Sequence, residues 1–166
     1  MTGPGYDVLL AAHVLSAVIG FGAVAASGVY AARGRKARDP LRERPLLRYF
    51  RPGTNWAARC LLLTPILGGT LLWAGDRAAA SEAWPWIGLG FWALAAAVAG
   101  SWCWPAERRI QEWLDAVNQA VIFGQEERPP PELESFRDSC LAVERSASAI
   151  SLCFLAAVVV MIAQPR

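Results

Sequence analysis

Several residue types that carry chemistry are rare in this sequence. Its 166 residues include one histidine and two methionines, and the four cysteines form no C-x-x-C pair. Zinc and redox sites usually need such pairs or several histidines, and the sequence also has no glycine-rich phosphate loop. No serine or cysteine is expected beside a histidine or carboxylate, as nucleophilic catalysis requires. We therefore expect a protein that is not an enzyme and has no metal site. The cysteines, expected to be small buried hydrophobic residues, are Cys60, Cys103, Cys140 and Cys153.

Charge is also scarce. Charged residues make up 18% of the chain and hydrophobic residues 55%, whereas about a quarter of the residues of a soluble domain are charged. A helix of about 20 apolar residues crosses a hydrocarbon core roughly 30 Å thick. We therefore predict an all-α membrane protein, a single integral membrane domain over residues 1–166 with four transmembrane helices. The four apolar stretches are residues 9–32, 54–75, 83–104 and 146–164.

The basic residues are distributed asymmetrically. Residues 33–53, directly after the first apolar stretch, contain eight basic and two acidic residues. Short basic loops stay on the cytoplasmic side of a membrane. We therefore predict that loops 33–53 and 105–145 are cytoplasmic and that both termini lie outside a bacterial inner membrane, with the helices in an antiparallel bundle. The basic residues of the first loop are expected to contact anionic lipid headgroups or a partner rather than nucleic acid. They are Arg33, Arg35, Lys36, Arg38, Arg42, Arg44, Arg48 and Arg51.

Small residues recur at four-residue spacing in the first predicted helix and follow a proline in the second. This spacing lets two helix backbones approach closely within a bilayer. Pro65 is expected to kink the second helix, with Thr64 or a neighbouring helix satisfying the carbonyl oxygen that the proline frees. Thr54 is expected to cap that helix. The predicted packing residues are Ser16, Gly20, Ala23, Ser27, Gly68 and Gly69.

Tryptophans mark both ends of the third predicted helix, as expected for residues that anchor at membrane interfaces. Pro105 is then expected to begin a separate cytoplasmic amphipathic helix that lies along the membrane or against a partner. A linker over residues 124–131 precedes a helix that begins at Pro131 and continues into the last span. The residues predicted to face lipid or a partner here are Trp84, Trp86, Trp102, Trp104, Ile110, Trp113 and Val117.

His13 is the only ionisable residue expected deep within a span, and such residues are costly in a bilayer unless they serve a function or find a partner. One interpretation is a neutral imidazole bonded to a carbonyl or hydroxyl group of a neighbouring helix. A second is binding of haem or copper, with another ligand from Met161, a symmetry mate or a partner. A third is a direct contact with a partner protein.

Four other charged residues are expected at the cytoplasmic ends of the spans. Either they form ion pairs that fix the helix arrangement there, or each is separately solvated. They are Arg59, Glu107, Glu144 and Arg145.

Three segments of the sequence resemble a family of small, uncharacterised bacterial four-helix integral membrane proteins. They are the first helix with its early histidine (HVLSAVIGFGAVAASGVYAARGRK), the second helix ending in LGGTLLWAG, and the third helix, bounded by tryptophans and ending in ERR. That family is distantly similar to copper-resistance D type membrane domains, which implies that His13 would be the copper-binding residue. Small proteins of this kind also resemble accessory subunits of actinobacterial respiratory oxidase assemblies, which implies a place in electron transport.

Three functions are compatible with these features. The first is a non-enzymatic accessory or scaffold subunit of a larger bacterial membrane complex, expected to be a respiratory cytochrome or oxidase assembly. Its partners would be membrane lipids and other subunits, and it would carry no cofactor. The alternative is a haem- or copper-binding membrane protein that uses His13. The third is a small-solute transporter, which the lack of buried charges disfavours.

Overall fold

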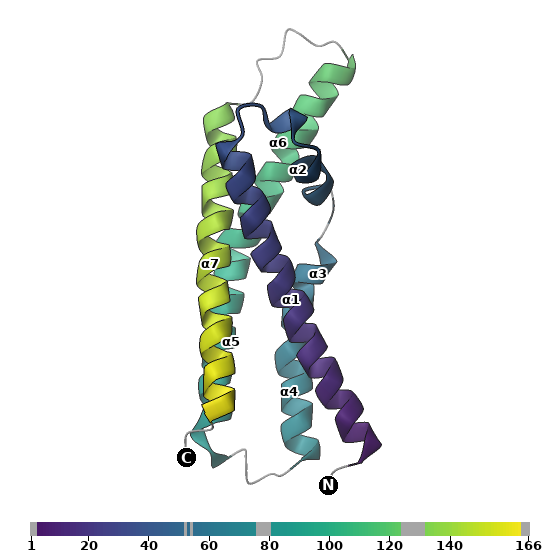
Figure 1. The fold of residues 1–166 in the computed structure, drawn as a ribbon, viewed down its shortest axis with the longest axis vertical. Coiled ribbons are helices and arrows are strands. Elements are labelled where there is room, and N and C mark those ends of the chain that lie inside the picture. Colours follow the sequence, from purple (N-terminus) through teal and green to yellow (C-terminus); the bar gives the residue numbers. More distant parts are fainter. Residues whose placement is uncertain (1–2, 52, 54, 76–80, 124–131, 164–166) are drawn as a thin grey trace. The chain divides into compact units, whose positions relative to one another are not determined.

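The described part of the chain is mainly helical. The computed structural model describes residues 3–51, 53, 55–75, 81–123 and 132–163, and it contains no strand among them. Four helical stretches are long and apolar enough to cross a membrane (Figure 1). They are Pro4–Lys36, Trp56–Ala74, Ala83–Gln119 and Leu133–Ala163. The prediction of an all-α protein with four helices of membrane-spanning length is therefore confirmed.

The chain divides into two compact units. The first unit consists of Met1–Val24, Asn55–Ala97 and Ala149–Arg166. The second unit consists of Ala25–Thr54 and Val98–Ser148. Helices α1 (Pro4–Lys36) and α7 (Leu133–Ala163) each contribute one end to the first unit and the other end to the second.

Helix α1 is longer at both ends than the predicted span 9–32. It begins at Pro4, because proline suits a first helical position where no N–H partner is needed. It continues to Lys36, so that Arg33 and Arg35 belong to its last turn rather than to a loop. Positive charge is favourable there, because the carbonyl end of a helix carries partial negative charge.

The segment predicted as a cytoplasmic loop over residues 33–53 contains further helical structure. It includes a 3₁₀ turn, η1 (Pro40–Arg42), and a short helix, α2 (Arg44–Tyr49), that has a proline in its first turn. Leu46 and Phe50 are each only 2% exposed. This segment therefore packs into the second unit through its apolar residues.

The second apolar stretch forms three short elements in place of one regular helix. They are α3 (Trp56–Arg59), the 3₁₀ turn η2 (Cys60–Leu62) and α4 (Leu63–Ala74). Asn55 caps α3, since its Oδ1 accepts the N–H of Ala58 at 3.2 Å; Thr54, the predicted cap, lies outside the described residues. The 3₁₀ turn precedes Pro65, as expected where a proline removes one helical hydrogen bond.

The third predicted helix does not end at Trp104. Helix α5 (Ala83–Val98) passes through a π-helical turn, η4 (Ala99–Cys103), into α6 (Trp104–Phe123). In that turn the N–H of Trp104 bonds to the carbonyl oxygen of Ala99, five residues back. The wider turn accommodates Pro105, whose ring would collide with a carbonyl group in a regular α-helix. Pro105 therefore lies in the first turn of α6, as expected, but α6 continues from α5 without an intervening loop.

Helix α7 includes residues 146–163 of the fourth predicted span and about three and a half turns before it, at 3.6 residues per turn. It begins at Leu133, with Glu134 in its first turn, where negative charge is favourable. The predicted linker over residues 124–131 and the predicted start at Pro131 lie outside the described residues.

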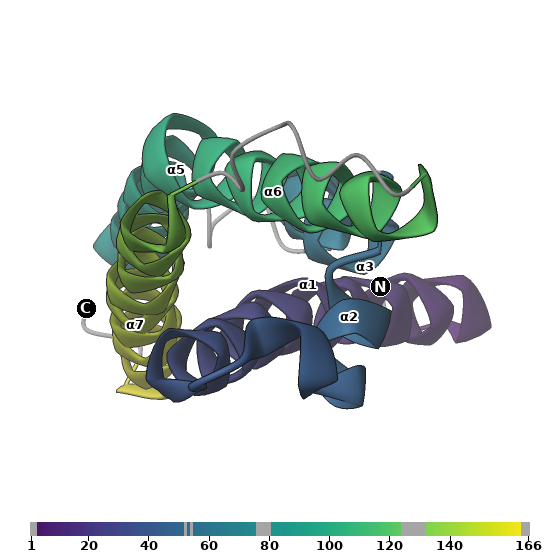
Figure 2. The ribbon, with the colours of Figure 1, turned by 90° about the horizontal axis from the view of Figure 1, so that it is seen from above.

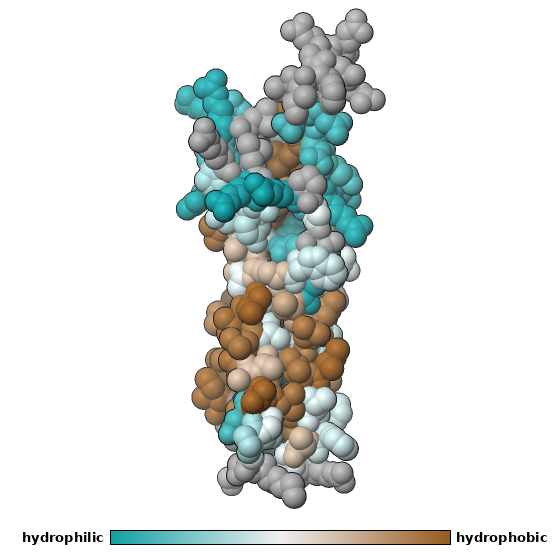
Figure 3. Space-filling model, turned by 90° about the vertical axis from the view of Figure 1, so that its right-hand side faces the viewer, coloured by the Kyte–Doolittle hydropathy of each residue, from teal (hydrophilic) through white to brown (hydrophobic). Residues whose placement is uncertain are grey.

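The first unit leaves much of its apolar surface exposed. Inside it, the rings of Phe21 and Phe154 stack with their centroids 4.3 Å apart. Several large apolar side chains of α1 are exposed, including Val8 at 69% and Leu15 at 58%. Figure 3 shows hydrophobic side chains gathered over the lower part of the face drawn. Apolar patches of this kind on a helical protein are typical of contact with lipid or with other proteins.

The second unit has a better covered core, to which α6 and α7 contribute. Ile110 of α6 and Phe136 of α7 are at most 1% exposed. The rings of Trp113 and Phe136 pack with their centroids 4.4 Å apart. Figure 2 shows α2 beside α1, and the stacked rings of Tyr30 and Tyr49 join these two helices.

Candidate functional site

His13 bonds to the backbone of another helix in the first unit. Its Nδ1 lies 2.9 Å from the carbonyl oxygen of Thr64. Because a carbonyl oxygen only accepts, Nδ1 carries the proton and donates, and a neutral ring then has its lone pair on Nε2. The ring lies against Gly68, where a Cβ atom would come within 3.0 Å of Cε1. This arrangement is the hydrogen bond to a neighbouring helix that one of the three interpretations anticipates.

Ser16 adds a second polar link between the same elements. Its Oγ donates to the carbonyl oxygen of His13 at 2.8 Å and lies 3.3 Å from Oγ1 of Thr64. Ser16 is 7% exposed and Thr64 is 9% exposed, so these hydroxyl groups are buried. His13 and Ser16 therefore use polar atoms to join α1 to the start of α4.

The His13 ring also has the form of a histidine that binds a metal. Such histidines donate one ring N–H to a carbonyl or carboxylate, which orients the other nitrogen toward the metal. Nε2 of His13 is therefore suited to be one ligand of haem or copper. Within the described residues, no group of three or more His, Cys, Asp or Glu side chains is placed to hold a metal ion. Met161, the possible second ligand, has its Cε 3.3 Å from the position of a Cβ atom on Gly88.

The glycines predicted to allow close packing behave differently from one another. A Cβ atom on Gly20 would lie 2.8 Å from Cα of Leu61, so α1 approaches the backbone of η2 directly. Gly69 is exposed and has nothing within 4 Å of its Cβ position, which corrects its predicted packing role. Gly28 lies against Ala147 of α7, because a Cβ atom on Gly28 would be 2.7 Å from the Cβ of Ala147. Ala23, also predicted to pack, is half-buried.

Ser27, predicted as a packing residue, is part of a buried polar chain in the second unit. Its Oγ donates to Oε1 of Glu107 at 2.5 Å and lies 3.0 Å from the hydroxyl of Tyr49. Ser27 is fully buried and Glu107 is 6% exposed. The sequence contains a signal for this burial, because Glu107 lies between Cys103 and Ile110 at helical spacing, on the apolar face of α6.

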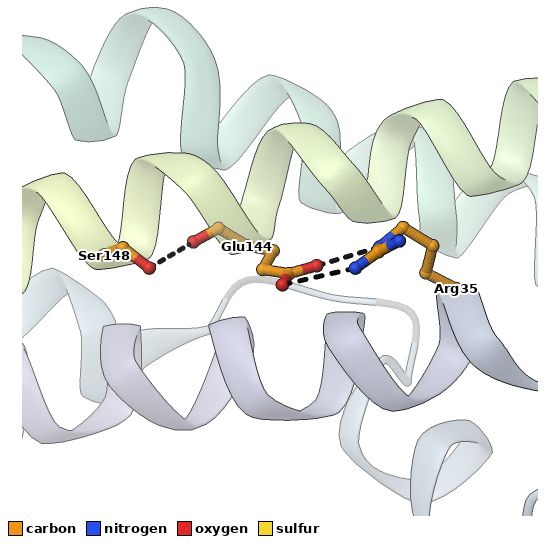
Figure 4. Close-up of polar contacts among 3 residues, drawn as sticks. All are labelled: Arg35, Glu144 and Ser148. Atoms are coloured by element: carbon orange, nitrogen blue, oxygen red, sulfur yellow. Dashed lines mark hydrogen bonds and ion pairs between the residues drawn. The ribbon is translucent and has the colours of Figure 1, made fainter.

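Glu144 forms an ion pair with Arg35 in the second unit (Figure 4). The distance from Nε of Arg35 to Oε2 of Glu144 is 2.9 Å, and both side chains are about one-third exposed. Arg35 was predicted to face lipid or a partner, and its side chain is also engaged within the chain. The pair joins the last turn of α1 to α7. The sequence left two alternatives open for Glu144, an ion pair within the set Arg59, Glu107, Glu144 and Arg145 or separate solvation, and Arg35 was not in that set.

Cys140 lies on α7 before the apolar stretch 146–164, four residues from Glu144. Its side chain is buried, and its Sγ lies 3.4 Å from the Cβ position of Gly34. Burial raises the pKa of the Cys140 thiol to about 12. The positive charge of Arg35 lowers this pKa and the negative charge of Glu144 raises it, each by less than burial does. Cys103 is also fully buried, whereas Cys60 and Cys153 are half-buried. The prediction of small buried residues therefore describes two of the four cysteines.

Most basic residues of the predicted interface are on the surface. Arg42 also pairs with Asp39 at 3.1 Å, and the side chain of Arg44 lies outside the described residues. An open groove of about 560 Å³ is lined by Tyr30, Pro45, Arg48 and Tyr49. The exposed basic side chains are Arg33, Lys36, Arg38, Arg42, Arg48 and Arg51.

The predicted aromatic and apolar interface residues fall into two groups. Trp86 and Trp102 are 63% and 64% exposed, as lipid or partner contacts require. Ile110 and Val117 are 0% and 9% exposed, and they are buried within the second unit. Their expected contact with lipid or a partner is therefore corrected, because α6 directs its apolar face into the core. The half-buried members of the set are Trp84, Trp104 and Trp113.

A comparison with protein-family models, curated proteins and solved structures finds no match to this chain.

Proposed function

We propose that this chain is a non-enzymatic accessory or scaffold subunit of a larger membrane complex. The observation that supports this best is that polar side chains in the apolar stretches form hydrogen bonds within the chain. The imidazole of His13 and the indole N–H of Trp92 bond to carbonyl oxygens of other helical elements, and Oγ of Ser16 lies 3.3 Å from Oγ1 of Thr64 on α4. These groups hold helices together, and the large exposed apolar surface remains for contact with lipid or other subunits.

The proposed orientation follows from charge. The four helices cross a bacterial inner membrane in alternating directions, with both termini outside and the basic segment after α1 in the cytoplasm. Single cysteines on a variant in which the four native cysteines are changed to alanine test this, through labelling of intact cells with a membrane-impermeant maleimide. Gly3→Cys should react from outside and Arg38→Cys only after the cells are permeabilised. The opposite pattern would overturn the orientation.

Extraction of the untagged native protein in mild detergent tests the proposed role. The extract is separated by size, and each fraction is analysed by mass spectrometry and absorption spectroscopy. We expect the chain to migrate with a large complex, whose co-migrating subunits would identify the assembly. The resemblance described above points to a respiratory cytochrome or oxidase assembly. Migration as a free monomer would contradict a subunit role.

The geometry of His13 favours a second candidate, a haem- or copper-binding membrane protein. The bond from Nδ1 to Thr64 leaves Nε2 as the ring nitrogen suited to bind iron or copper. Because the chain has one histidine, a bis-histidine haem would need a second chain. The purified protein would then show a Soret band or stoichiometric copper. His13→Ala should abolish that signal and Gly69→Ala should preserve it. A colourless, copper-free native protein would exclude this candidate.

A further inference from the structure

The open groove of the second unit has an aromatic wall, formed by Tyr30 and Tyr49, and a positive charge from Arg48. Pro45 completes its lining. The rings of Tyr30 and Tyr49 stack with their centroids 4.4 Å apart and an interplanar angle of 23°. Phe50 packs edge-on against Tyr49 at 5.2 Å. Because the wall is formed before any ligand enters, ordering it on binding costs little entropy.

Buried groups behind the groove also hold Tyr49 in place. Its hydroxyl lies 3.0 Å from Oγ of Ser27, and Ser27 donates to the carboxylate of Glu107. Turning the Tyr49 ring away would break this hydrogen bond inside the unit, where unsatisfied polar groups are costly. The wall therefore has a fixed position relative to α1.

The charge around the groove suits an anion. Arg48 lines it and is exposed, and the guanidinium carbon of Arg33 lies 5.9 Å from the centroid of the Tyr30 ring. Three carboxylates of the same unit are engaged by other groups: Asp39 pairs with Arg42, Glu144 pairs with Arg35, and Glu107 accepts the hydroxyl of Ser27 behind Tyr49. The exposed Glu43 precedes Pro45 by two residues. Guanidinium groups form charge-assisted hydrogen bonds to phosphate oxygens, often in a bidentate arrangement.

The groove lies where the apolar part of α1 gives way to charge. Tyr30 is close to the end of the uncharged stretch, Arg33 follows three residues later, and Val29 is 54% exposed. At such a boundary, aromatic rings and arginines meet the phosphate layer of a bilayer and apolar side chains meet the acyl chains. A soluble phosphate would use the charge but not the adjacent apolar surface.

We propose that this groove binds the headgroup of one anionic phospholipid, whose phosphate is held by Arg33 and Arg48 and whose glycerol region lies against Tyr30 and Tyr49. The inference depends on the membrane insertion proposed above but not on a partner complex. It adds a discrete lipid site to the general attraction between a basic segment and an anionic membrane.

Native mass spectrometry of the purified full chain tests the proposal, with phosphatidylglycerol and phosphatidylcholine supplied together in mixed micelles. We expect one retained phosphatidylglycerol, and Arg48→Gln should lower its retention about tenfold through loss of a charge-assisted bond. Arg38→Gln is the matched control, because it removes the same charge from another exposed position. It should change retention less than about twofold. Arg33→Gln gives a second, independent variant of the site.

Two results would overturn the lipid site. Equal losses in Arg48→Gln and Arg38→Gln would indicate diffuse attraction to negative charge. Displacement of phosphatidylglycerol by glycerol phosphate at equal concentration would indicate a site for a soluble phosphate. Because the measurement uses the isolated chain, a missing partner complex would not affect it. Conversely, a failed lipid site would leave the proposed subunit role unchanged.

Discussion

The indole N–H of Trp92 on α5 donates to the carbonyl oxygen of Leu61 at 2.9 Å. In a regular helix, that carbonyl would accept the N–H of residue 65, four residues later, but residue 65 is a proline and has none. Leu61 is fully buried, so water is not available to its carbonyl group from the protein exterior. A neighbouring helix therefore satisfies the carbonyl that Pro65 frees, which was one of the two expected solutions.

Replacing Trp92 with phenylalanine should destabilise the protein by about 1 kcal/mol, because the Leu61 carbonyl loses its donor while most of the aromatic bulk remains. Unfolding in mixed micelles with increasing SDS fraction, followed by circular dichroism, measures this change.

A double-mutant cycle with Pro65→Ala shows whether the two residues act on the same carbonyl. Alanine supplies an N–H at position 65, so Trp92→Phe should cost less in that background, with a coupling energy of at least about 0.5 kcal/mol. Purely additive effects would contradict this account.

Gly20 and Gly22 lie two residues apart on α1 but should respond oppositely to alanine. A Cβ atom on Gly20 would collide with backbone atoms of Leu61 and Cys60, which cannot move away as a flexible side chain can. A Cβ atom on Gly22 would have no other atom of this kind within 4 Å. Gly20→Ala should therefore cost about 1–3 kcal/mol of stability. Gly22→Ala should be neutral or stabilising by up to about 1 kcal/mol, because alanine favours the helix. The same SDS unfolding assay compares them, and a neutral Gly20→Ala would refute the close approach.

The Arg35–Glu144 pair should contribute modestly and in a salt-dependent way. Both side chains are about one-third exposed, so solvent screens the pair and its expected coupling energy is at most about 1 kcal/mol. Arg35→Gln, Glu144→Gln and the double variant form the cycle, measured at low and high salt. The coupling should shrink toward zero near 1 M salt. Arg38→Gln controls for net charge, and an equal coupling between positions 38 and 144 would argue against a specific pair.

Cys140 should react very slowly with maleimides. With a pKa near 12, only about one thiol in ten thousand is ionised at pH 8, and burial further limits access. Because the thiolate is the reactive form, the rate should rise about tenfold per pH unit between pH 8 and pH 10, where the thiol remains mostly protonated. The test chain retains Cys140 and has alanine in place of the other three cysteines, with labelling followed by mass spectrometry.

An exposed thiol provides the comparison for Cys140. Arg38→Cys, in a chain whose four native cysteines are alanine, should label much faster at pH 8, and SDS unfolding should bring Cys140 close to that rate. Equal rates in the folded proteins would show that Cys140 is accessible.

Part of the candidate site could be predicted because it depends on local sequence. His13 could be identified because an ionisable residue within an apolar stretch is recognised from the linear sequence. A hydrogen bond to a neighbouring helix was among its expected roles. The acceptor, Thr64, lies 51 residues away, and no local pattern identifies it. The burial of Glu107 was missed, although its position on an apolar helical face was a usable signal.

The sequence by itself determined that this chain forms four helices long and apolar enough to cross a membrane, because hydropathy and helix length are local properties. Only the tertiary structure decided which small residues permit close contact. Gly20 packs against the backbone of Leu61, whereas the Cβ position of Gly69 has no neighbouring atom within 4 Å, although both are glycines of predicted packing faces. The tertiary structure likewise decided that Glu144 pairs with Arg35 and that the apolar face of α6 packs inside the second unit. The physical reason is that helical spacing defines a face, whereas the partner of that face depends on how distant segments pack.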